Sequence, residues 1–258
     1  MDKVIITCFA GRKEYLQIQS KYIIKILELY DFVESYDIWD FAWSEEDSLF
    51  LLELSKEHPK INIKYSPNYG IAERGGEVAS KQFAYFFSQA YDYDTYKDHT
   101  FIKIDDDVLY VDFLNFQHLI HTRQQYPEYF LVSANVINSD LSIIDPTAIH
   151  LDFLNNFKDP NLEEVHSSVT GIEYSNRFRL SINFCSWLGR DIPHIVSEFS
   201  NGIGADDEWR LCHVIPLKLN RNNLILKDYK VAHFSFGTQN FNKNLIRTKY
   251  QNLCNTII

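Results

Sequence analysis

The sequence lacks the patterns that mark several large classes of protein. Its formal net charge is -10, and no cluster of Lys and Arg interrupts that acidic balance. General nucleic-acid binding is therefore not expected, because phosphate backbones are held by clustered cations. No apolar run reaches membrane-spanning length, and the amino terminus leads into an expected strand without a charged and then apolar leader. We predict a cytoplasmic protein with no transmembrane segment, and peripheral membrane association through a partner stays open.

Cysteine is also scarce. The four cysteines form no Cys-x-x-Cys pair and have no His at zinc-finger spacing, so neither structural zinc nor a disulfide framework is indicated. We expect reduced thiols. Hydrophobic residues, in contrast, make up 45% of the 258 positions and aromatic residues 15%. That supply is enough for a substantial core and argues against intrinsic disorder.

Apolar strand-like segments alternate with helical patterns through the first half of the chain. This order predicts an α/β fold in which a mostly parallel central sheet carries helices on both faces, and no linker divides residues 1–258. A long irregular segment, 138–169, follows and suggests a lid or part of an acceptor site. The expected strands are 3–9, 36–43, 61–65, 101–110, 129–136 and 224–236, and the expected helices are 14–30, 44–57, 77–91 and 113–126.

The most informative stretch is 101–110, where three consecutive aspartates lie between two short apolar runs. If the strand continues through them, Asp105 and Asp107 point to one side and Asp106 to the other. Two like charges ~4 Å apart repel by roughly 4 kcal/mol at an effective dielectric of 20. A magnesium, manganese or calcium ion would replace that repulsion with ligation. The alternative is an acidic turn whose carboxylates are solvated or cap the next helix.

Two further places could meet an anionic ligand. The turn Ala10-Gly11-Arg12 follows the first strand, where Gly11 allows close approach of the backbone and Arg12 could pair with a diphosphate. Arg74 precedes the helix expected from residue 77, which also favours an anion. An ordinary loop and a surface arginine are the simpler interpretations.

The carboxyl-terminal half offers an acidic helix start after two glycines, at 201–210. Asp207 there could accept a proton from a substrate hydroxyl, although carboxylates at helix starts are also common caps. His233 ends the last expected strand and could complete a metal site with the earlier carboxylates, or it could be structural. Trp187 could line a pocket or belong to the core.

The order of these motifs resembles that of nucleotide-sugar-dependent glycosyltransferases with the GT-A fold. Asp105-Asp106-Asp107 resembles their Asp-x-Asp motif, and Asp206-Asp207 resembles the acidic pair whose second member is the catalytic base of inverting members. His233 resembles the carboxyl-terminal metal ligand. The resemblance spans nearly the whole chain, with residues 1–136 as the nucleotide-sugar-binding half and 137–258 as the acceptor-binding half.

The resemblance implies a metal-dependent transfer of a sugar from a UDP- or GDP-linked donor to a hydroxyl of a glycan or other acceptor, as in polysaccharide biosynthesis. Manganese or magnesium would be held by Asp107 with Asp105 and His233, while Asp105 or Asp106 could instead contact the ribose. Asp207 would act as base, favouring inversion, although retaining members share the Asp-x-Asp motif. Ala10, Gly11, Arg12 and Arg74 would contact the donor, and Trp187 and Trp209 could stack on a sugar.

Two other functions fit the same residues. A metal-dependent nucleotidyl or phosphoryl transferase also uses aspartates at strand ends, although neither a Walker lysine loop nor a glycine-rich nucleotidyltransferase signature is present. A non-catalytic carbohydrate-binding relative would keep the sugar contacts without turnover.

Overall fold

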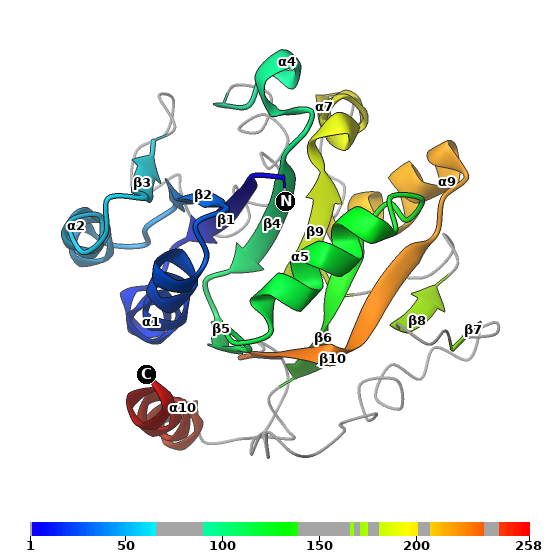
Figure 1. Ribbon diagram of the computed structural model, residues 1–258. Helices are drawn as coiled ribbons and strands as arrows, with labels where there is room; N and C mark the ends of the chain where they lie inside the picture. Colours follow the sequence, from blue (N-terminus) through cyan, green and yellow to red (C-terminus); the bar gives the residue numbers. More distant parts are fainter. Residues whose placement is uncertain are drawn as a thin grey trace.

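Among the residues that the structure describes, ten strands form one twisted sheet through the middle of the molecule (Figure 1). The computed structural model describes residues 2–65, 90–138, 166–167, 171–174, 181–200, 207–234 and 243–258. Most of the segment 138–169, nearly all of the expected helix 77–91, and Arg74 lie outside these residues. Along the main path the strand order is β3-β2-β1-β4-β9-β6-β10-β8-β7, and β5 pairs with β10 beside that path.

The first four strands along the path run parallel to one another, as the alternating pattern predicts. Their apolar side chains are buried because helices cover both faces of a parallel sheet. These strands are β3 (Ile61–Lys64), β2 (Val33–Asp40), β1 (Val4–Ala10) and β4 (Thr100–Asp105).

The second half of the sheet is mixed. One antiparallel strand, absent from the predicted set, separates β4 from the parallel pair β6 and β10. A short strand after the aspartates, also not predicted as separate, pairs antiparallel with the end of β10. The bounds are β9 (Phe184–Leu188), β6 (Val132–Asn138), β10 (Asn223–His233), β5 (Val108–Val111), β8 (Gly171–Tyr174) and β7 (His166–Ser167).

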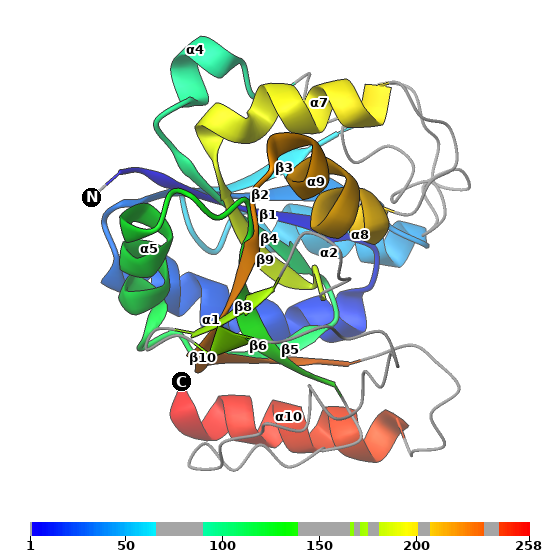
Figure 2. The ribbon, with the colours of Figure 1, turned by 90° about the vertical axis from the view of Figure 1, so that its right-hand side faces the viewer.

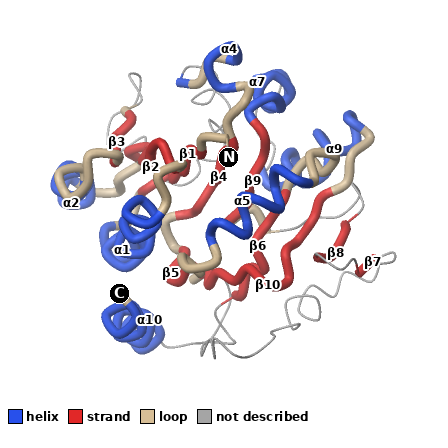
Figure 3. The backbone as a smooth tube through the Cα atoms, viewed as in Figure 1, coloured by secondary structure: helices blue, strands red, loops and turns tan. Residues whose placement is uncertain are grey.

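Helices cover both faces, as Figures 2 and 3 show. One face carries α1 (Lys13–Leu29), α2 (Glu45–Leu54), α5 (Phe116–Gln125) and α10 (Lys243–Ile257). The other carries α4 (Tyr93–Tyr96), η3 (Gly189–Asp191), α7 (Ile192–Ser200) and the consecutive segments α8 (Asp207–Trp209), η4 (Arg210–Val214) and α9 (Ile215–Leu219).

The two faces bury separate hydrophobic clusters. Alternation along β1 sends Val4 and Ile6 into the cluster under α1 and Ile5 into the opposite one. The apolar stripe predicted for α1, Tyr15 to Leu29, is buried as far as Ile26, but its last member, Leu29, is 53% exposed and was wrongly included. Ser44 caps α2 by accepting a hydrogen bond from the backbone N–H of Asp47 at 3.1 Å, as its sequence predicts. No helix among the described residues is long and apolar enough to cross a membrane.

Trp187 lies inside the second cluster, on β9, and this corrects its predicted role. Its exposed fraction is 0%, and its ring stacks on Phe101 with centroids 6.2 Å apart. An acceptor sugar cannot stack on a ring without an exposed face. Burial of apolar area between β4 and β9 explains the position better than ligand binding.

We expect Trp187→Ala to lower the free energy of unfolding by about 3 to 5 kcal/mol, because it leaves a cavity in a packed core. Trp209, which is 42% exposed, provides a matched control. Trp209→Ala should change that free energy by less than about 1 kcal/mol. Urea unfolding of both variants measures the difference, and equal destabilisation would contradict the core assignment.

All four cysteines are buried and free, which confirms the expectation of unpaired thiols. Burial raises the pKa of Cys185 to about 12 and raises the pKa of Cys8 well above its ordinary value. The thiolate is the reactive form, so both groups should be inert in the native state.

Native protein at neutral pH should therefore react with fewer than one equivalent of Ellman's reagent within minutes, and unfolded protein with about four. Absorbance at the two conditions gives the count. Rapid labelling of a native thiol would show that the buried positions open readily.

Candidate active site

Polar side chains gather at the edge of the sheet where the parallel strands end. β1 ends at Ala10, β4 at Asp105 and β10 at His233. Ligand sites of open α/β sheets lie at this edge, because loops leaving the strand ends can diverge and form a crevice.

The three aspartates form a turn instead of a continuing strand. β4 ends at Asp105 and β5 begins at Val108. Asp106 accepts hydrogen bonds from the backbone N–H of Gly11 at 2.9 Å and from Nε of Arg12 at 3.0 Å. The same guanidinium lies 3.0 Å from Asp107. Asp106 and Asp107 thus share one cation, and the predicted alternation of their side chains is wrong because the extended geometry stops at Asp105.

Asp107 and His233 are brought together by strand pairing. Val108 lies opposite His233 in the β5–β10 ladder, and the backbone N–H of Phe234 donates to the carbonyl of Asp107 at 2.7 Å. As a result Nε2 of His233 lies 3.2 Å from Oδ1 of Asp107. Residues 126 positions apart are held in contact by main-chain hydrogen bonds.

Asn183 connects this pair to Asp105. Its Nδ2 donates to Oδ2 of Asp105 at 2.8 Å and lies 2.9 Å from Nε2 of His233. The backbone adds a further link, since the N–H of Asp105 donates to the carbonyl of Asn183 at 2.9 Å. Asp105, Asn183, His233 and Asp107 therefore form one continuous polar network, which contains the three predicted metal ligands.

Neighbouring charges shift the pKa values of the network in opposite directions. Burial alone would raise the pKa of Asp107, but His233 and Arg12 together lower it below its usual value. Burial would lower the pKa of His233, and Asp107 raises it instead. Burial raises the pKa of Asp106 despite the pairing with Arg12. These directions favour an ion pair between Asp107 and His233.

Lys103 is a site residue that belongs to none of the sequence motifs. It is buried on β4, where its Nζ pairs with Asp105 and donates to the carbonyl of Ile182 at 3.1 Å. Burial would lower its pKa, but the charges of Asp105 and Asp207 raise it. The charge of Asp207, at the start of α8, therefore acts on the same buried ammonium group as Asp105. The sequence signal for this pair is its spacing, because residues two apart in a strand, such as Lys103 and Asp105, point to the same face.

Gln19 on α1 binds the backbone of the acidic turn, residues 105–108, through its side-chain amide. Its Nε2 donates to the carbonyl of Asp105 at 2.5 Å and to that of Val108 at 3.3 Å, on either side of the turn. Its Oε1 accepts from the hydroxyl of Tyr36 at 2.8 Å. A fully buried amide inside the apolar stripe of α1 is thereby satisfied, and the turn is fixed to the helix.

The remaining predicted residues lie in several places. Ala10 is buried at the end of β1, next to Gly11. Trp209 is exposed on α8, and its ring stacks on His213 with centroids 3.9 Å apart. Arg74 and Asp206 lie outside the described residues.

The network offers two carboxylates and an imidazole, and the carboxylate oxygens are ligands that suit magnesium and manganese. In the arrangement described, however, Asp107 faces His233 and Arg12, while Asp105 faces Lys103 and Asn183. Among the described residues, no three His, Cys, Asp or Glu side chains are grouped as a metal site. Metal binding by Asp105, Asp107 and His233 thus stays a prediction.

Comparison with solved structures shows that this chain has a fold of the GT-A type. A CMP:2-keto-3-deoxy-manno-octonic acid synthetase complexed with CTP matches with a TM-score of 0.51 at 9% identity, over 99% of both chains. A 4-diphosphocytidyl-2C-methyl-D-erythritol synthase from Anaerococcus prevotii matches with a TM-score of 0.50 at 8% identity, over 97% of this chain and 96% of that one.

TarS from S. aureus matches with a TM-score of 0.52 at 10% identity, over 99% of this chain and 65% of that one. These neighbours with a GT-A-like fold are nucleotidyltransferases and a glycosyltransferase. No protein-family model matches the sequence, and no curated protein matches it. At such low identity the likeness shows the fold alone.

We expect Arg12→Ala to lower the free energy of unfolding by about 3 to 5 kcal/mol, because it leaves Asp106 and Asp107 buried without their shared cation. Adding Asp106→Asn should recover part of that loss by removing one of the two charges. Lys13→Ala, which breaks a more exposed pair with Glu46, should cost less than about 1 kcal/mol. Urea unfolding compares the three variants, and equal losses for Arg12→Ala and Lys13→Ala would contradict this account of the turn.

Proposed function

We propose that this protein is a glycosyltransferase that moves a sugar from a nucleoside-diphosphate sugar to a hydroxyl of a glycan or other acceptor. The observation that carries the proposal is the contact between Asp107 and His233 at the strand-end edge, with Asp105 joined to His233 through Asn183. In order and residue type they resemble the Asp-x-Asp motif and carboxyl-terminal His of glycosyltransferases with the GT-A fold.

The donor would lie over the ends of β1 and β4. Ala10 and Gly11 would lie against the nucleotide, and Asp105 or Asp106 could contact the ribose. The N–H of Gly11 already donates to Asp106, and its carbonyl accepts from the N–H of Trp43. Arg12 is committed to Asp106 and Asp107 in this structure, so a contact with the diphosphate would require that pairing to open. Until then Arg12 orients the acidic turn.

A divalent cation, manganese or magnesium, would be held by Asp107 with Asp105 and His233 and would supply positive charge for the departing nucleoside diphosphate. The chain's own contribution is to hold these side chains in place through Gln19, Asn183 and the β5–β10 ladder. Rigid supporting contacts matter because a small displacement of a reacting group greatly lowers the reaction rate.

Asp207 would remove the proton from the acceptor hydroxyl as that oxygen attacks the anomeric carbon, which inverts the configuration. Its position supports the role, since its charge acts on Lys103 beside Asp105. Trp209, exposed two residues later, could stack on the acceptor.

A nucleotidyltransferase is the second candidate, and the fold likeness to a CTP-bound synthetase favours it. The two reactions release different products. A glycosyltransferase releases a nucleoside diphosphate, whereas a nucleotidyltransferase that uses CTP releases pyrophosphate. Incubation with UDP- and GDP-sugars in one series and with nucleoside triphosphates in another, each with manganese, distinguishes them by product analysis.

We expect nucleoside diphosphate to be released from a nucleotide sugar, and Asp207→Asn to lower kcat by about a hundred-fold to ten-thousand-fold, the usual effect of losing a general base. Donor binding should persist, because Asp207 acts on the acceptor. Asp94→Asn, at an exposed position on α4, is the matched control and should keep full activity. Pyrophosphate release from a nucleoside triphosphate, with no turnover of any nucleotide sugar, would favour the second candidate.

A further inference from the structure

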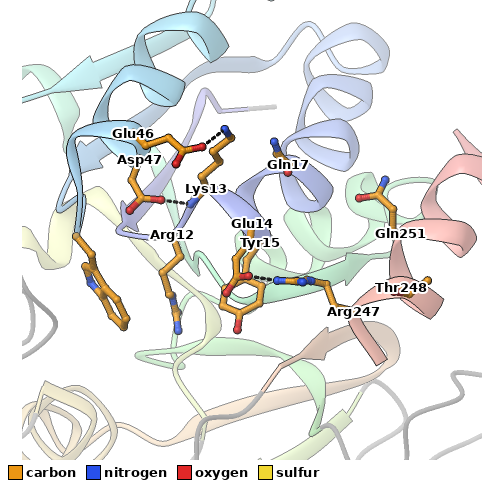
Figure 4. Close-up of a pocket in the computed structure, with 11 residues that line it drawn as sticks. Arg12, Lys13, Glu14, Tyr15, Gln17, Glu46, Asp47, Arg247, Thr248 and Gln251 are labelled. Carbon is orange, nitrogen blue, oxygen red and sulfur yellow. Dashed lines mark hydrogen bonds and ion pairs between the residues drawn. The ribbon is translucent and has the colours of Figure 1, made fainter. Parts of the chain in front are cut away.

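A groove of about 780 Å³ lies beside the acidic turn, between the start of α1, the β2–α2 loop and α10 (Figure 4). Its volume falls in the range of small-molecule sites, roughly 300 to 1,000 Å³. Arg12 and Trp43 line one part of it, Gln17 another, and Thr248 and Gln251 the part on α10. The groove is therefore built by residues far apart in the sequence and shares Arg12 with the candidate active site.

Trp43 gives the groove a large aromatic surface. It is 53% exposed, although its position is fixed. Its backbone N–H donates to the carbonyl of Gly11 at 3.2 Å, and a Cβ on Gly11 would lie only 2.7 Å from the indole Nε1. The guanidinium of Arg12 lies 5.3 Å from the centre of its ring. Glycine at position 11 thus allows the indole to pack on the backbone as a preorganised platform.

The charged side chains of the groove are already paired with each other or with neighbours. Lys13 pairs with Glu46 at 2.7 Å, and its backbone N–H donates to Asp47 at 2.8 Å. Arg247 pairs with Glu14, as the dashed lines of Figure 4 show. Arg12 pairs with Asp106 and Asp107.

The paired charges make the groove polar without favouring an ion. An anionic ligand would have to break these pairs, whereas a neutral ligand with many hydroxyls can use them as donors and acceptors. The amides of Gln17 and Gln251 add further donors and acceptors. An exposed aromatic face surrounded by polar side chains suits the apolar face and hydroxyl edge of a sugar ring.

We propose that this groove binds a neutral stretch of the acceptor glycan, with Trp43 as its stacking platform. The inference rests on the proposed function, and it adds to the acceptor contacts proposed for Asp207 and Trp209 a second binding surface on the opposite face, formed by α1, the β2–α2 loop and α10. Because Arg12 contacts both the groove and the acidic turn, a glycan bound there would extend to the edge of the candidate active site.

Saturation-transfer NMR with three neutral trisaccharides, maltotriose, cellotriose and N-acetylchitotriose, tests the groove at millimolar concentration. The wild-type protein should bind at least one of them, and Trp43→Ala should bind it about ten-fold more weakly, the factor expected for loss of one aromatic contact. Trp43→Phe should retain part of the affinity. Leu29→Ala alters an equally exposed apolar residue at the far end of α1 and should leave binding unchanged.

Two results would overturn the groove assignment. One is the absence of a signal from all three trisaccharides with wild-type protein. The other is weaker binding of a nucleoside diphosphate, with unchanged trisaccharide binding, in Trp43→Ala, which would assign the groove to the donor.

The proposed function can fail separately. Trisaccharide binding that depends on Trp43, in a protein that turns over no nucleotide sugar, would support the groove and contradict the transferase. Transfer activity together with an unaltered trisaccharide signal in Trp43→Ala would support the transferase and contradict the groove assignment.

Discussion

Three adjacent carboxylates at the end of β4 must be neutralised, and the rest of the site is arranged around that requirement. Two like charges at ~4 Å cost roughly 4 kcal/mol at a dielectric of 20, a large fraction of the stability of a domain. The structure meets the demand with partners for each aspartate, and the guanidinium of Arg12 is shared by Asp106 and Asp107. Lys103 and Asn183 contact Asp105, Gly11 and Arg12 contact Asp106, and Arg12 and His233 contact Asp107.

Three of these partners come from parts of the chain far from β4, so the acidic turn also ties the fold together. Arg12 precedes α1, His233 ends β10, and Asn183 precedes β9. A ligand that competes for one partner would change the balance at the others. This coupling gives a physical reason why donor, metal and acceptor sites could depend on one another in the proposed reaction.

Much of the fold could be predicted from the sequence because its first half follows a regular rule. Apolar strands alternate with amphipathic helices, and right-handed crossovers then dictate a parallel sheet. β9 was not predicted, because an antiparallel strand inserted between β4 and β6 pairs with residues some 50 to 90 positions away, and no local pattern marks that partner. Without β9, the sequence gives no reason to bury Trp187, so a sugar-stacking role for it is predicted wrongly.

The site was predicted in part. Strand order brought Asp105, Asp107 and His233 together as expected, but periodicity could not foresee the turn that places Asp106 and Asp107 on one guanidinium. Gln19 carried a detectable signal, a polar residue within an apolar helical stripe. Asn183 carried none, because an asparagine near an irregular segment is an ordinary loop residue until its neighbours are known.

The measurement that tests the central claim most directly is a thermal-shift comparison of wild type and Asp107→Asn with UDP- and GDP-sugars in the presence of manganese. A ligand that binds only the native state raises Tm, so we predict a rise for the wild type with one of the donors and its loss in Asp107→Asn. An equal rise in both proteins, or no rise with any donor, would contradict the assignment of the acidic turn as the nucleotide-sugar site.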